Sequence, residues 1–131
     1  MAADAPLDLD RGFDYLYGLQ IDELSGDGAR GSVQVRDELR QPGGRVHGGV
    51  AAAISHSLAC GATAAAAGGG IVAEVLSNQT SYLEPLAGDT IRAQARPLHR
   101  GRTTWVWEVQ IADDAGCLCA LARVTVAIRP R

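Results

Sequence analysis

The sequence predicts an α+β domain in which an antiparallel sheet wraps around one long central helix. An alanine-rich run over residues 50–67 is small and apolar on nearly every side and stops at three glycines, which is typical of a buried helix with a firm end. Alternating apolar and polar segments, joined by turn sequences, lie on both sides of this run. The 131 residues suit one domain, 1–131, because little chain would be left for a second core.

The segment before the helix is predicted to hold a short helix and a hairpin. Residues 1–18 mix acidic with aromatic residues, which indicates a short helix whose aromatic side chains cover the core. Residues 19–24 and 29–36 alternate roughly between apolar and polar, and Ser-Gly-Asp-Gly separates them. That pattern favours a strand, a tight turn and a second strand.

After the helix the pattern predicts four strands, at residues 71–83, 90–98, 103–112 and 118–128. The sequences between them are rich in Gly, Pro and Asp, which favour turns. Because short links commonly join antiparallel neighbours, we expect the four strands to form a meander. The segment 41–49, rich in Pro and Gly, is expected to be a loop that leads into the helix.

Charge and hydropathy exclude two classes of partner. The net charge is -3, and the basic residues are arginines scattered along the chain, with a cluster only at Arg96, Arg100 and Arg102. Nucleic-acid binding normally needs a broad basic face. We find no apolar run of the roughly 18 to 20 residues that span a bilayer, and the acidic start is unlike a signal peptide. We therefore expect a cytoplasmic protein that binds neither nucleic acid nor membrane.

Three cysteines, Cys60, Cys117 and Cys119, cannot all pair. Cys117 and Cys119 would lie on one face of one strand, a poor arrangement for a disulfide. The sequence pattern offers no further ligands that would complete a metal site. We expect reduced, structural thiols and no bound metal.

Four motifs stand together in one order along the chain. They are the loop Gln41 to Val46, the step His47-Gly48-Gly49 into the helix, the run Ser81 to Pro85 followed by Gly88-Asp89, and Arg100-Gly101-Arg102 before a strand. Over nearly its whole length the chain thereby resembles the hotdog-fold acyl-CoA thioesterases, including the phenylacetate-pathway and 4-hydroxybenzoyl-CoA types. The resemblance implies a hotdog fold and hydrolysis of an acyl-CoA thioester to the free acid and CoA. It implies no cofactor, because CoA is part of the substrate.

The start of the central helix is a candidate site for the thioester carbonyl. The N–H groups of Gly48 and Gly49 lie at the positive end of the helix, where they can polarise a carbonyl oxygen, and glycine permits close approach. Alternatively, the two glycines only allow close contact between helix and sheet. The resemblance implies that Gln41 holds the carbonyl or the attacking water and that His47 supports the loop. His47 also suits a purely structural role, tying the loop to the sheet by hydrogen bonds.

His56 departs from the family pattern. The family's catalytic carboxylate lies nine residues after the motif histidine, and this chain has His56 there. Histidine is a good general base near neutral pH but a poorer nucleophile than a carboxylate in this role. Three interpretations stay open: a base that activates water, a relic in an inactive acyl-CoA binder, or a deliberately changed residue.

Helix geometry indicates that one chain does not make a complete site. Gly48 and His56 are eight residues apart, about 12 Å along a helix, so one carbonyl cannot touch both. An enzyme therefore needs Gly48 of one copy to face His56 of another. We expect a homodimer that pairs as a dimer of dimers, although the sequence does not distinguish a dimer from a tetramer.

Two further groups of residues are candidates for substrate contacts. Those for the acyl portion are Gly49, Ser57, Cys60, Asn78, Ser81 and Tyr82, and those for the CoA phosphates are His99, Arg100, Gly101, Arg102 and Thr103. For any single member of the first group, a role in helix or strand contacts is an alternative, and the second group also fits an exposed basic hairpin. Hydration of acyl thioesters on the same fold is disfavoured, because no Asp or Glu lies between Gln41 and His47.

Overall fold

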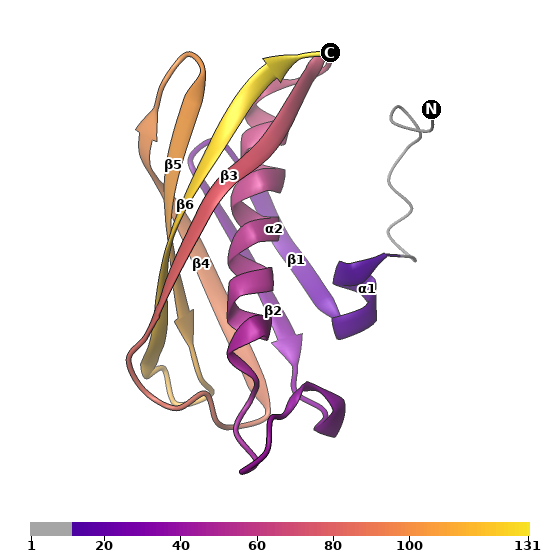
Figure 1. Ribbon diagram of the computed structural model, residues 1–131, viewed down its shortest axis with the longest axis vertical. Coiled ribbons are helices and arrows are strands. Elements are labelled where there is room, and N and C mark those ends of the chain that lie inside the picture. Colours follow the sequence, from indigo (N-terminus) through magenta and orange to yellow (C-terminus); the bar gives the residue numbers. More distant parts are fainter. Residues whose placement is uncertain (1–11) are drawn as a thin grey trace.

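The computed structural model describes residues 12–131 and confirms the predicted α+β class (Figure 1). The elements are α1 (Phe13–Tyr17), β1 (Leu19–Ser25), β2 (Gly28–Gln34), the 3₁₀ helix η2 (Asp37–Leu39), α2 (Gly48–Ala67), β3 (Ile71–Tyr82), β4 (Thr90–Arg100), β5 (Thr104–Ala112) and β6 (Leu118–Pro130). One six-stranded antiparallel sheet curves around α2. The expected hairpin of β1 and β2 and the expected long helix are therefore confirmed.

The strand order corrects one expectation. The sheet runs β1-β2-β4-β5-β6-β3, so β3 pairs with β6 and forms an edge, while β4 lies between β2 and β5. The predicted meander is therefore wrong for its first strand. The link from β3 to β4, residues 83–89, can span about 23 Å when extended, whereas three strand spacings amount to about 14 Å. A short link was enough to cross the end of the sheet.

Helix α2 fills the core with a stripe of buried side chains, some large and some small. Its buried residues recur in adjacent pairs four apart, namely Val50, Ala51, Ile54, Ser55, Leu58, Ala59, Ala62 and Thr63. The polar members are satisfied: Ser55 Oγ donates to the Ala51 carbonyl, and Thr63 Oγ1 accepts from the indole of the fully buried Trp107 at 2.9 Å. On the sheet side, β4 alternates buried and exposed residues, as expected of a sheet with one face on the core.

The expectation that no apolar run is long enough to span a membrane is wrong for α2. The helix has 20 residues, and an 18-residue window within it has a mean hydropathy of 1.4, which suffices for a span by length and composition alone. The same length and composition also suit a core helix, and α2 contacts all six strands. The position of α2 inside the curved sheet accounts for its apolar character.

The short helix before β1 covers the core only in part. Within α1, Tyr17 is buried, whereas Phe13, Tyr15 and Leu16 are exposed. The helix ends at Gly18, whose φ of 83° is a left-handed conformation that glycine adopts readily. The part of the helix prediction that fell on residues 1–11 lies outside the described residues.

Candidate active site

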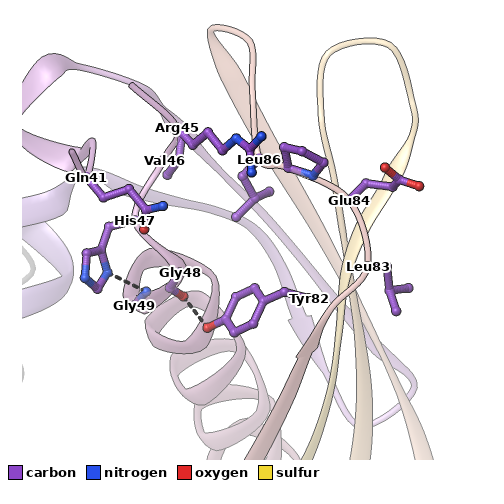
Figure 2. A pocket seen from close by; sticks show the side chains of 11 residues that line it. Gln41, Arg45, Val46, His47, Gly48, Gly49, Tyr82, Leu83, Glu84 and Leu86 are labelled. Carbon is purple, nitrogen blue, oxygen red and sulfur yellow. Dashed lines mark hydrogen bonds between the residues drawn. The ribbon is translucent and has the colours of Figure 1, made fainter. Parts of the chain in front are cut away.

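The loop before α2 and the segment after β3 enclose a cavity of about 550 Å³ (Figure 2). Its lining includes the predicted residues Gln41, His47, Gly48, Gly49 and Tyr82, and it is completed by Arg45, Val46 and residues 83–86. The loop is closed by backbone bonds from Gln41 N to Arg45 O, from Val46 N to Leu86 O and from His47 N to Leu39 O. These bonds fix the loop to η2 and to the link between β3 and β4, and the helix start lies at the cavity wall.

His47 caps the first turn of α2 and uses one of the two candidate amides. Its Nδ1 accepts a hydrogen bond from Gly49 N–H at 2.8 Å. The imidazole must be unprotonated at Nδ1 to accept this bond, which puts the proton of the neutral ring on Nε2. The Gly48 N–H, by contrast, donates to no group within residues 12–131. Of the two amides expected to be free, only that of Gly48 is available to a ligand.

Tyr82 holds the Gly48–Gly49 peptide from the opposite side. Its hydroxyl donates to the Gly48 carbonyl at 2.6 Å, and Figure 2 shows the ring reaching from the end of β3 to the first turn of α2. A Cβ atom at Gly48 would lie only 2.8 Å from Tyr82 Cζ, so glycine is required for this contact. The sequence suggested Tyr82 as a substrate contact; the structure shows it bonded to the helix start.

Gln41 presents a free amide at the cavity. Its backbone is fixed by bonds to Gly44 and Arg45, and the tight turn between them uses positive φ at Gly43 and Gly44. Its side chain is exposed and makes no hydrogen bond within the described chain. In Figure 2 it points toward the first turn of α2. An amide placed there can donate to a carbonyl oxygen or hold a water molecule.

His56 lies in a separate, smaller cavity midway along α2. This cavity measures about 340 Å³ and is lined by Phe13, Ala52, Ala53, His56, Ser57 and Asn78. The His56 side chain is exposed and forms no hydrogen bond within residues 12–131. The rise from Gly48 to His56 is about 12 Å along the helix. One chain therefore brings the predicted catalytic residues together in two groups, not one.

Asp14 of α1 is a carboxylate bonded to Ser57, the residue that follows His56, and sequence reasoning did not identify it. Its Oδ1 accepts from Ser57 Oγ at 2.7 Å and from Tyr17 Oη at 2.9 Å. Burial and then the Asp14 charge raise the pKa of the Tyr17 hydroxyl, and the same two causes raise the pKa of the Cys60 thiol. The only signal in the sequence was an acidic residue one helical turn before a tyrosine.

Other residues suggested for the acyl portion mostly join α2 to β3. Asn78 Nδ2 donates to the Ala52 carbonyl at 2.9 Å, and Thr80 holds Asn78 Oδ1 at 2.8 Å. Cys60 Sγ donates to the Ala73 carbonyl at 3.4 Å. Ser81 is exposed on β3 and its hydroxyl has no hydrogen bond within the described residues. Ser57 and Asn78 share the His56 cavity, whereas Cys60 and Ser81 line neither of the two.

The segment suggested for CoA forms the turn between β4 and β5, at the opposite end of α2 from Gly48 (Figure 1). Arg100 pairs with Asp27 Oδ1 at 2.9 Å and also donates to the Gly26 carbonyl. Arg102 is exposed and pairs with no acidic group in residues 12–131. Gly101 closes the turn by donating to the Thr104 carbonyl, next to His99 and Thr103. Since α2 is about 30 Å long, this segment and Gly48 of the same chain do not share one small site.

Comparison with known proteins places the chain in a family. The profile of the thioesterase superfamily matches residues 43–120. A Mycobacterium tuberculosis protein provisionally named an esterase is 38% identical over 125 residues, covering 92% of this chain and 88% of its own. The 1,4-dihydroxy-2-naphthoyl-CoA hydrolase of Listeria monocytogenes is 29% identical, covering 87% of this chain and 93% of its own.

Solved structures show the same arrangement of strands around a helix. A Staphylococcus aureus thioesterase, solved as two alanine variants, superposes with a TM-score of 0.84 at 26% identity. The variant that replaces a glutamate covers 90% of this chain and 98% of its own. The other replaces a glutamine that lies fifteen residues earlier in that protein. The predicted hotdog fold is confirmed, and the chain belongs to the thioesterase superfamily of hydrolases.

Proposed function

We propose that this protein hydrolyses an acyl-CoA thioester to the free acid and CoA, at a site shared between two copies of the chain. The observation that carries the proposal is the Gly48 amide: it lies at the positive end of α2, belongs to a residue that lines a cavity of about 550 Å³, and has no partner within the described residues. A hydrogen bond from this amide stabilises a thioester oxygen most strongly when negative charge develops on that oxygen during the reaction.

In the proposed reaction the chain supplies three functions. The Gly48 N–H binds the carbonyl oxygen, the Gln41 amide orients the carbonyl or the water, and His56 of the partner subunit accepts a proton from the water. The oxygen of that water bonds to the carbonyl carbon. The C–S bond then breaks, and the leaving CoA sulfur takes the proton from the imidazolium.

Three features support a site made by two copies. Gly48 and His56 of one chain are about 12 Å apart along α2. β3 is an edge strand twelve residues long, and it carries the exposed side chains of Val72 and Leu76. Long unprotected edges are readily paired by another strand. Pairing of β3 edges, with the dimers assembling further into a dimer of dimers, would cover these side chains and place a second copy beside the His56 cavity.

Relatives support the substrate class and the position of His56. The Listeria relative is named for a CoA thioester substrate, which favours acyl-CoA here. The glutamine and glutamate replaced in the S. aureus thioesterase are fifteen residues apart, the same separation as Gln41 and His56. This equal spacing supports assigning His56 to the position of that glutamate.

The presence of histidine at position 56, where the family has a carboxylate, also favours a second function. His56 has no hydrogen-bonding partner in residues 12–131 that would orient it as a base. If it cannot serve as a base, the chain binds acyl-CoA without hydrolysing it. Both functions use the Gly48 cavity, and they differ only in whether free thiol appears.

Measuring thiol release from a panel of aromatic and aliphatic acyl-CoAs separates these two functions. We expect catalytic release of CoA from at least one member, with no release when Gln41→Ala and His56→Ala are combined. Binding of acyl-CoA esters by calorimetry without thiol release would instead establish the non-catalytic function. Sedimentation at micromolar concentration should show at least a dimer, and a fully active monomer would contradict the shared site.

A further inference from the structure

The turn between β5 and β6 gathers three metal-binding side chains outside the candidate active site. A carboxylate oxygen of Asp113 and the sulfur atoms of Cys117 and Cys119 all lie within 4.8 Å of one another. Cys117 is exposed, Asp113 is half-buried and Cys119 is buried. An ion can therefore reach this cluster from solvent through Cys117.

Backbone bonds hold the turn in this conformation without any ion. Asp113 Oδ1 accepts from the amides of Ala115 and Cys117, each at 3.0 Å, and Asp113 N–H donates to the Cys117 carbonyl. Gly116 closes the turn at a φ of 80°. The other carboxylate oxygen, Oδ2, has no hydrogen bond within the described residues and is free to act as a ligand. The backbone of this turn is therefore already ordered before a ligand binds.

Charge at this turn also favours a cation. No guanidinium in residues 12–131 forms an ion pair with Asp113. A divalent ion would offset the carboxylate and allow both thiols to lose their protons.

We propose that Asp113, Cys117 and Cys119 bind a thiolate-preferring divalent cation of the zinc type, with solvent as the fourth ligand. Two thiolates and one carboxylate are a tetrahedral donor set that suits zinc and disfavours magnesium or calcium. In such a site the ligand atoms lie roughly 3.5 to 3.8 Å apart, so closing the cluster needs about 1 Å of side-chain movement. Binding releases one proton from each thiol, so the affinity should rise with pH.

The proposed site adjoins the wall of the Gly48 cavity. The Cys119 carbonyl accepts hydrogen bonds from Leu83 N–H at 2.8 Å and Glu84 N–H at 3.2 Å, and both residues line that cavity. Figure 1 shows the β5–β6 turn beside the link from β3 to β4. A bound ion would hold this turn and, through it, one side of the cavity.

Titration of the full-length, reduced protein with Cd²⁺ tests the proposal, because thiolate-to-cadmium charge transfer gives an ultraviolet band. We expect one Cd²⁺ per chain with this band and displacement by Zn²⁺. Cys117→Ser should remove the band and weaken binding by at least about tenfold. Asp113→Asn, which keeps the oxygen that holds the turn, should weaken binding with the band retained. Cys60→Ser is the matched control, because Cys60 lies on α2, and it should bind as the wild type does.

Cys117 is exposed, so its replacement should leave the fold intact, and unchanged melting without metal checks this. Zn²⁺ should raise the melting temperature of the wild type and not that of Cys117→Ser. A wild type without the charge-transfer band, or a Cys117→Ser variant that binds as tightly as the wild type, overturns the proposal. A further outcome also overturns the proposal: the reduced protein shows no band, and two titratable thiols disappear in air. Cys117 and Cys119 would then be a redox couple and not metal ligands. None of these outcomes depends on thioesterase activity.

Discussion

The N-terminal end of α2 and the middle of the same helix differ in how far one chain completes them. At the N-terminal end His47 binds the Gly49 amide and Tyr82 binds the Gly48 carbonyl, and the Gly48 amide, in a residue that lines a cavity, has no partner within residues 12–131. In the middle, His56 is exposed with no hydrogen bond in the described residues. The first region is preorganised by the chain itself. The second needs another surface before its geometry is defined.

This difference shows which catalytic function each region suits. Electrostatic stabilisation of a carbonyl oxygen depends on donors that are already in place, and the helix start provides one. Proton transfer tolerates a base that becomes aligned only in the assembled complex, so an exposed histidine at the interface of two copies is compatible with it. The following experiments test this division.

His56→Ala should have the largest effect. If His56 of the partner accepts the proton of the water, this change should lower kcat by about 10²-fold or more with little change in KM. Steady-state rates of the wild type and the variant measure this. The alternative predicts the opposite order: His56→Ala changes little and His56→Glu creates or raises hydrolysis. Equal activity of all three would move the chemistry away from α2.

Gly48→Ala tests the preorganised end. The added Cβ would lie 2.8 Å from Tyr82 Cζ, and the exposed ring can swing out to make room. We expect a folded protein that loses about 1 kcal/mol with the Tyr82 bond. Alanine keeps the backbone N–H, so kcat should fall only because the added methyl group and the lost Tyr82 bond displace this donor, and the fall should not exceed about 10²-fold. Tyr82→Phe should show a smaller fall in kcat at constant KM.

Gly69→Ala is the matched control for Gly48→Ala. No atom lies within 4 Å of a Cβ placed at Gly69, so activity and melting temperature should stay at wild-type values. If Gly48→Ala keeps full activity, the close contact between Gly48 and Tyr82 is not needed to position the N–H that is proposed to bind the carbonyl. If it loses stability and activity together with its fold, Tyr82→Phe decides the matter, because the tyrosine ring stays in place.

Sequence periodicity predicted the elements well because each is a local property. The long helix, the first hairpin and the strand segments agree with the structure to within a few residues at their ends. The position of β3 at the sheet edge was missed, since a link of seven residues does not encode where it leads. Turn sequences indicate that the chain reverses; they do not indicate which strand it joins.

The candidate site divides in the same way. The loop and helix start are continuous in sequence, so the cavity at Gly48 follows from one motif. The bond from Tyr82 to Gly48 joins residues 34 apart, and the bond from Ser57 to Asp14 joins residues 43 apart. Pairings at that distance have no local pattern, so neither contact was predicted. The chemical roles assigned to Gln41 and His56 stay predictions.

The stability of the protein at alkaline pH should depend on the buried thiol of Cys119, which lies near the wall of the Gly48 cavity. The pKa of Cys119 is raised from 9.0 to about 11, chiefly by burial. Above pH 9 the unfolded chain loses this proton while the folded chain keeps it, so the free energy of unfolding should fall as pH rises from about 9 to 11. The slope from this group is at most about 1.4 kcal/mol per pH unit. Urea unfolding with a chelator present measures it. Cys119→Ala should show a shallower decline than Cys117→Ala, and equal slopes would contradict the assignment.

The smallest expected effect concerns the turn at the far end of α2. Arg102 has no acidic partner within residues 12–131, whereas Arg100 already pairs with Asp27. A CoA phosphate must compete for Arg100 but not for Arg102, so Arg102→Ala should raise KM about threefold to tenfold and Arg100→Ala by less.

Both increases should be larger at low ionic strength, where exposed charges are screened least, and kcat should not change. Arg30→Ala, which breaks the exposed pair with Glu23 on the first hairpin, removes the same charge elsewhere and should leave KM unaltered. An equal rise in KM for Arg30→Ala would mean that only the net charge of the protein matters. A fall in kcat for Arg102→Ala would mean that this turn takes part in the reaction and not in CoA binding.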